Sequence, residues 1–209
     1  MAIISNAVTI ADAGAFSASL GSMVLIKTIT VSSAAGTVSF VDGASSVVLD
    51  DTYPLYKFEF INIHPGTNDK GLEFNVSIDT GSNYNVAKTT TFFRNYNYEN
   101  GNERGIAYQA GLDLANGTGF QPLTEGGISS DNDCSFNGAL VLFSPSDTTF
   151  VKHFMGTFSM IKSAAGGLCV NSHLGGYVNT TSAVDAVQFK MNAGNIDSGI
   201  IKLYGIKDS

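Results

Sequence analysis

The sequence predicts an all-β protein that folds as a single two-layer β-sandwich with the connectivity of a jelly roll. Glycine (23 of 209 residues) and the small polar residues are abundant, and only 14% of residues are charged, unlike the composition of helical bundles. Fourteen Phe and eight Tyr provide the apolar volume of a core, which argues against a disordered chain. Several segments alternate apolar and polar residues with period two, which is typical of strands with one buried face. The length fits one domain.

The amino-terminal half is predicted to contain an arm followed by the first strands. Residues 1–22 are small and weakly patterned, so we expect an arm that becomes ordered only against a neighbour, followed by a sandwich over residues 23–209. Strands are expected at 23–31, 55–63 and 72–79. In the first, one face should carry Met23, Leu25, Ile29 and Val31. In the second, Tyr56, Phe58 and Phe60 point inward before the apolar positions shift to Ile61 and Ile63, which predicts a bulge or a two-sided central strand.

The carboxyl-terminal half continues the same pattern and brings the expected number of strands to nine or ten. A central strand is expected at 140–143, a long strand at 150–160 with a bend at Gly156, an inward row at Val187, Phe189 and Met191, and a closing strand at 200–206. Turns are expected at 68–71, 79–81, 166–167, 175–176 and 195–199. The best helical candidate is the short segment 108–115.

The segment 95–133 is long, acidic and rich in Asn and Gly, and we expect it to form a long loop. Compact domains rarely keep such loops without a use in binding or assembly. The alternative is an excursion with a short helix or hairpin that packs on the sandwich. Both interpretations stay open at this point.

The charge of the chain limits its partners. Eleven Lys and Arg against eighteen Asp and Glu give a formal charge of −7, a surface that repels phosphate, so we expect no nucleic-acid partner. No basic residue precedes Lys27, and no run approaches the roughly 20 apolar residues of a membrane span. We therefore expect no cleaved leader, no membrane contact, and synthesis in the cytoplasm.

Residues with catalytic or metal-binding chemistry are scattered. The chain has no P-loop and no G-x-S-x-G nucleophile elbow. His64, His153 and His173 lack zinc-site spacing, so we expect His64 to end a strand and His153 to face solvent or a neighbouring subunit. Residues 131–133 (Asp-Asn-Asp) could begin a calcium loop, but an acidic solvated turn is favoured. Cys134 and Cys169 could pair, but plain buried thiols are favoured. We expect no enzyme, no cofactor and no metal.

One patch has the composition of a recognition surface. It consists of Arg94, Tyr96, Asn97, Tyr98 and Arg104, and it contains both arginines of the chain. Tyrosine faces stack on sugars and Asn or Arg bonds to hydroxyls, so the patch could contact a glycan. The alternative, which we favour, is a Tyr-rich strand edge that packs against a neighbouring subunit.

Several stretches, in this order along the chain, resemble small virion proteins of tailed phages of marine bacteria, including cyanophages and pelagiphages. They are residues 53–58, 61–65 with 67–69, 77–85, 180–189, 194–196 and 198–206. The resemblance covers most of the chain after Met23 and includes no catalytic signature. It implies a β-sandwich displayed on the particle as a fibre, decoration or adhesin module, usually a homotrimer.

Together these observations predict a non-enzymatic structural protein of the virion, made in the host cytoplasm. The expected partners are further copies of the chain and, through the arm, other capsid or tail proteins. The alternative function is a carbohydrate-binding module of the tail that recognises a host surface glycan.

Overall fold

The computed structural model describes residues 3–5, 8–12, 15–16, 22–162 and 167–207. Within these residues every regular element is a β-strand, which confirms the all-β prediction. No helix in this part of the chain is long and apolar enough to cross a membrane. The short helix expected at 108–115 is wrong, because these residues complete a strand and then form turns.

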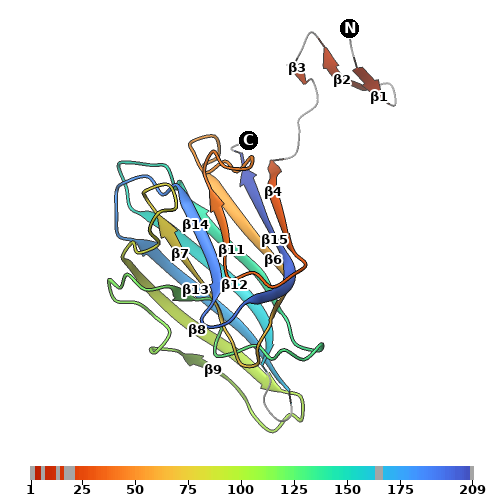
Figure 1. Ribbon diagram of the computed structural model, residues 1–209, viewed down its shortest axis with the longest axis vertical. Helices are drawn as coiled ribbons and strands as arrows, with labels where there is room; N and C mark the ends of the chain where they lie inside the picture. Colours follow the sequence, from red (N-terminus) through yellow and green to blue (C-terminus); the bar gives the residue numbers. More distant parts are fainter. Residues whose placement is uncertain (1–2, 6–7, 13–14, 17–21, 163–166, 208–209) are drawn as a thin grey trace.

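Two antiparallel sheets form the body of the molecule, and a third lies in the arm (Figure 1). The eight-stranded sheet has the order β4 (Met23–Val31), β15 (Ile196–Ile206), β6 (Leu55–Pro65), β11 (Phe136–Phe143), β12 (Lys152–Lys162), β13 (Leu168–Val178), β8 (Lys88–Tyr98) and β9 (Arg104–Tyr108). The four-stranded sheet has the order β10 (Gln121–Pro122), β7 (Leu72–Ser77), β14 (Ala186–Met191) and β5 (Val38–Val41). The two sheets are the layers of a β-sandwich. Their division into eight and four strands does not by itself confirm a jelly roll, which has eight strands in all.

A cluster of phenylalanine rings joins the two layers. Phe189 of β14 lies 5.2 Å from Phe58 and 5.0 Å from Phe60 of β6, between ring centroids. Phe74 of β7 lies 5.2 Å from Phe154 of β12. These edge-on contacts combine apolar burial with favourable ring geometry. We call the face of the eight-stranded sheet that carries this cluster its inner face, and the opposite one its outer face.

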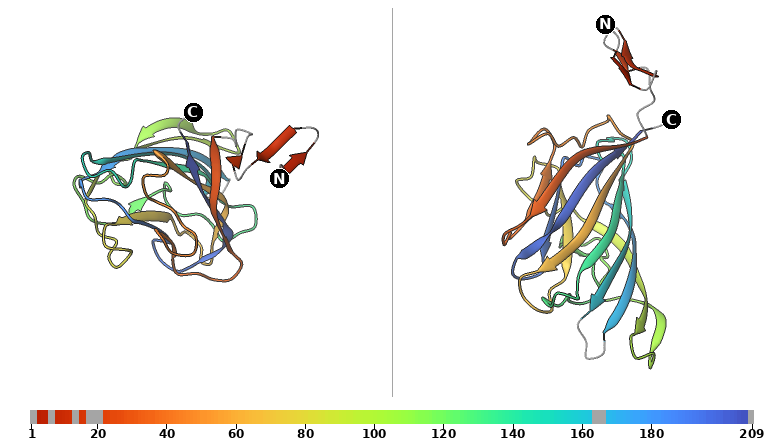
Figure 2. Two further views of the ribbon diagram at one scale, coloured as in Figure 1. Left: turned by 90° about the horizontal axis from the view of Figure 1, so that it is seen from above. Right: turned by 90° about the vertical axis from the view of Figure 1, so that its right-hand side faces the viewer.

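The arm contributes a small separate sheet. It contains β1 (Ile3–Ser5), β2 (Val8–Asp12) and β3 (Ala15–Phe16), which among the described residues pair only with one another. Figure 2 shows this sheet apart from the sandwich, near the start of β4 and the end of β15. That the arm becomes ordered through contact with a neighbouring protein stays a prediction.

Two strands differ from their predicted patterns in which side chains they bury. In β4 a register shift lies between Leu25 and Lys27, so Met23 and Leu25 point outward whereas Ile29 and Val31 point inward. A shared face for these four residues was therefore wrong, because a bulge reverses the parity of the side chains. In β6 the predicted bulge is confirmed by the positive φ of Asn62. The expected shift of Ile61 and Ile63 to the opposite face is wrong for Ile63, because the bulge returns this side chain to the inner face, where it is buried.

Other expectations about local structure have mixed outcomes. The Gly175–Gly176 pair was expected in a turn, but it lies inside β13, whose pairing with β12 and β8 is continuous. The turn expected at 195–199 is wrong for most of its length, because β15 begins at Ile196. The segment 95–133 begins in a β8–β9 hairpin and includes β10, so the hairpin alternative describes its first part and a plain loop does not.

Candidate functional site

The predicted recognition patch lies in the β8–β9 hairpin, at one edge of the eight-stranded sheet. Arg94, Tyr96 and Tyr98 share the inner face and are half-buried. Asn97 and Arg104 lie opposite each other on the outer face and are exposed. Because successive side chains of a strand point to opposite faces, the five residues do not form one surface.

The inner-face members of the patch already have partners within the chain. The Arg94 guanidinium forms a 2.7 Å ion pair with Glu125 Oε2 and lies 4.4 Å above the Tyr96 ring. Tyr96 donates its hydroxyl hydrogen to Glu103 Oε1 at 3.1 Å, and this bond raises the pKa of Tyr96. Arg94 therefore fastens the segment around Glu125 to the sheet, which is a structural role.

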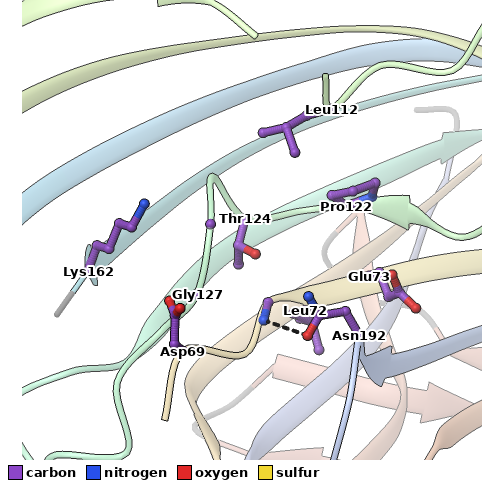
Figure 3. Close-up of a pocket in the computed structure, with 11 residues that line it drawn as sticks. Asp69, Leu72, Glu73, Leu112, Pro122, Thr124, Gly127, Lys162 and Asn192 are labelled. Atoms are coloured by element: carbon purple, nitrogen blue, oxygen red, sulfur yellow. Dashed lines mark hydrogen bonds between the residues drawn. The ribbon is translucent and has the colours of Figure 1, made fainter. Parts of the chain in front are cut away.

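A pocket of about 330 Å³ with a mixed polar and apolar lining opens beside this segment (Figure 3). Its lining consists of Asp69, Gly71, Leu72, Glu73, Leu112, Pro122, Thr124, Gly126, Gly127, Lys162 and Asn192. The Gly71 amide donates to Asn192 Oδ1 at 3.3 Å. A side chain at Gly71 would collide with Thr124, and one at Gly127 would collide with Asp69. The two loops that wall the pocket are thus held in close contact by glycines.

The charged side chains of this pocket are largely neutralised by neighbours. Glu73 forms a 3.0 Å ion pair with Lys190, and Lys162 lies 3.8 Å from Glu125. The lining includes no histidine, serine or cysteine, so it presents no nucleophile–histidine pair. The pocket therefore presents hydrogen-bonding groups, and most of its charged side chains are already paired with charges of opposite sign.

A second hollow, of about 430 Å³, lies on the outer face of the eight-stranded sheet. It crosses β12, β13 and β8, and we call it the glycine trough; its lining is Thr89, Thr90, Thr91, Phe143, His153, Phe154, Met155, Gly175, Gly176 and Tyr177. Gly175 stands between Met155 and Thr91 in one cross-strand row. The His153 and Tyr177 rings lie 6.0 Å apart on one side of this row, and the Phe93 and His173 rings stack at 4.7 Å on the other.

The three histidines are far from forming one site. His64 lies on β6, where its Nε2 is 3.1 Å from the Asp131 carbonyl oxygen. It comes directly before the last residue of the strand, as predicted, and His153 is exposed on the outer face, as predicted. In the described ranges, no group of three or more His, Cys, Asp or Glu side chains is placed to hold a metal ion.

The cysteines and the acidic turn have simple structural surroundings. Both thiols are free; Cys134 is buried, as predicted, whereas Cys169 is exposed on β13. Burial is the main cause that raises the pKa of Cys134 to about 11. Residues 131–133 are exposed in a turn, where Asp131 Oδ2 accepts a 2.8 Å hydrogen bond from Ser129.

Two features of the sequence were not predicted. Ser159 and Lys162 have the S-x-x-K spacing of some serine hydrolases. They lie on β12, where a separation of three residues puts them on opposite faces, so the spacing is not a catalytic pair here. The trough was missed because Gly175–Gly176 resembles a turn; the signal was the period-two pattern that continues from Leu174 to Val178.

Comparison of the chain with known protein families, with curated proteins and with solved structures finds no match.

Proposed function

We propose that the chain is a non-enzymatic structural protein on the exterior of a tailed-phage particle, of the capsid-decoration or tail-fibre type, which assembles as a homotrimer. The proposal rests on the stretches after Met23 that resemble such virion proteins and follow one another in the same order along the chain. The observation that carries it is the division of the chain into two parts. The sandwich contains all the residues of the buried core, including the phenylalanine cluster, and within the described residues β1, β2 and β3 pair only with one another.

An arm of this kind suits attachment to a neighbouring protein. Short strands with unpaired edges can extend a sheet of another chain through main-chain hydrogen bonds. The strand that follows the arm supports contact between copies as well. β4 is an edge strand, and its Met23 and Leu25 side chains are 47% and 52% exposed. Apolar side chains on an exposed edge favour burial against another subunit.

Deletion of residues 1–22 tests the proposal. The truncated protein should keep the strand-type circular dichroism spectrum and cooperative unfolding of the full chain, because the core lies outside the arm. In a complementation assay, particles purified on a density gradient should lack the truncated protein, since the segment proposed to attach it is gone.

The matched control is the full-length chain with Ile106→Ser, which changes the most exposed large apolar side chain of the sandwich without touching the arm. This variant should be incorporated normally. Incorporation of the truncated protein at the level of the full chain would contradict the proposal.

A further inference from the structure

Gly175 lies in the middle of an eleven-residue strand that gives no structural reason for a glycine. The pairing of β13 with β12 and with β8 runs through Gly175 without a register shift, so no bulge is present. Its φ lies outside the left-handed region. A Cβ built there would meet only Thr91 Oγ1, at 3.7 Å, which is an ordinary van der Waals contact. The fold would therefore accept a side chain at this position.

Glycine inside a strand lowers stability, because its backbone loses more freedom on folding and it has no side chain to pack. Such a glycine usually marks a bulge, a sharp bend, or a place where a ligand or another backbone comes close. The continuous pairing on both sides excludes a bulge at Gly175, and its φ lies outside the range that only glycine adopts readily. The cause that fits an open position of this kind is close approach of another molecule to the floor of the trough.

The rings on either side of Gly175 limit the size of that molecule; Tyr177 and His153 line the trough, whereas His173 and Phe93 lie beside it. Tyr177 and His173 lie two residues on either side of Gly175 and on the same face of β13, so their Cα atoms are roughly 14 Å apart. Each is backed by a second ring, Tyr177 by His153 and His173 by Phe93. Between the two ring pairs the Gly175 backbone carries no side chain, which leaves it open to contact with a single ring.

We propose that the glycine trough binds an uncharged saccharide ring. Its lining contains no Lys, Arg, Asp or Glu. The aromatic and imidazole rings offer apolar faces to sugar C–H groups, and Thr89, Thr91, His153 and Tyr177 offer hydrogen-bonding groups to sugar hydroxyls. The net charge of −7 works against an acidic sugar, so a neutral one is complementary to both the trough and the protein around it.

A second copy of the same face is a poorer occupant. Lys57, Glu59 and Lys202 lie on the outer face three to four strands away from Gly175. A flat contact between two such faces would take these charges out of water, at a cost that their pairing does not reliably offset. The proposal does not depend on where the protein is located, and so it is independent of the proposed virion function.

Titration of the full-length, ¹⁵N-labelled protein with single sugars tests the proposal by NMR. The probes are methyl α-D-glucoside, methyl β-D-galactoside, methyl α-D-mannoside and N-acetylglucosamine, with N-acetylneuraminic acid as the acidic probe. At least one neutral probe should shift the amide signals of Gly175 and Thr91, and the acidic probe should not. Gly175→Leu, which fills the trough, should weaken that binding at least tenfold.

The matched control is Gly36→Leu. A Cβ at Gly36 also meets a single side-chain atom at 3.7 Å, Asn195 Oδ1, but Gly36 lies in the connection between β4 and β5, outside the trough. This variant should bind like the unaltered chain. Tyr177→Leu removes one wall without filling the trough, and it replaces Gly175→Leu as the test if that variant fails to fold.

Three results would overturn the proposal. They are no binding of any neutral probe, binding that Gly175→Leu and Tyr177→Leu leave unchanged, and equal binding of the acidic probe. Sedimentation of the Gly175→Leu variant tests whether a second copy of the chain covers the trough instead. A lower oligomeric state with unchanged sugar binding would mean that the trough is an interface between copies. A negative result for sugar binding would not change the expected result for the deletion of residues 1–22. The two proposals can therefore fail separately.

Discussion

The two faces of the eight-stranded sheet differ most clearly at two adjacent glycines of β13. Gly176 points to the inner face, where a Cβ would lie 2.7 Å from the Thr89 carbonyl oxygen and 2.9 Å from Phe154 Cζ. Gly175 points to the outer face, where a Cβ would meet only Thr91 Oγ1 at 3.7 Å. The first glycine is required by packing and the second is not. Two adjacent glycines of one strand are therefore present for different reasons, and only Gly176 is needed for the packing of the fold.

The contrast extends over the whole sheet. The inner face is filled by rings and aliphatic side chains that are almost fully buried. The outer face holds six of the eight large apolar side chains that are exposed in the described residues, namely Met23, Leu25, Phe93, Ile106, Tyr108 and Met155. Stability should accordingly depend on the inner face, whereas the outer face should be free to change without loss of the fold.

The largest expected difference is between Phe189, which packs against the inner face from β14 of the four-stranded sheet, and Met155 on the outer face. Phe189→Ala removes a fully buried ring that contacts Phe40, Phe58 and Phe60, so it should lower the free energy of unfolding by about 3–5 kcal/mol. Met155→Ala, at a side chain that is 56% exposed, should change it by less than about 0.5 kcal/mol. Denaturant unfolding of both variants measures the difference, and similar losses would contradict the division of roles.

A lysine on the inner face should make stability depend on pH. Lys88 is fully buried, and its ammonium donates only to neutral acceptors, Asn75 Oδ1 and the Val86 carbonyl oxygen. Burial lowers its pKa from 10.5 to about 8. Between these values the unfolded chain keeps a proton that the folded chain has lost, so stability should rise with pH. The gain from pH 8 to 10.5 should be about 3 kcal/mol.

Two substitutions isolate this contribution. Lys88→Met should remove most of the rise in the free energy of unfolding between pH 8 and 10.5, measured by urea unfolding at several pH values. Lys57→Met removes a lysine from the outer face, where Lys57 pairs with Glu59 and is in contact with solvent. This control should leave the rise in place. An unchanged slope in Lys88→Met would mean that the buried ammonium is not its source.

The sequence was a good guide to the core between the two sheets because burial leaves a periodic pattern of apolar residues. The rows at Tyr56, Phe58 and Phe60 and at Val187, Phe189 and Met191 were predicted from period two alone, and these side chains are buried. Prediction failed where one residue changes parity, as at the bulge of β4, since nothing in the composition of that strand marks the shift.

The outer face and the candidate sites were less predictable. The patch around Tyr96 was chosen by composition, but strand alternation divides it between two faces. The trough depends on which residues of three strands are neighbours, a register that a sequence does not display. Glycine adds to the difficulty, because a turn, a tight contact and an open floor all use the same residue.

The comparison of Gly176 with Gly175 gives the smallest effect and the most direct test of the two causes. Gly176→Ala should lower the free energy of unfolding by about 1–3 kcal/mol, because its Cβ enters the space of the Thr89 carbonyl and the Phe154 ring. Gly175→Ala should leave stability unchanged or raise it by about 0.5–1 kcal/mol, since alanine has less freedom to lose in the unfolded chain. Thermal and urea unfolding of the two variants provide the measurement. A decrease in the free energy of unfolding for Gly175→Ala as large as that for Gly176→Ala would mean that the fold needs both glycines. The glycine at position 175 would then be explained by packing alone, without a ligand.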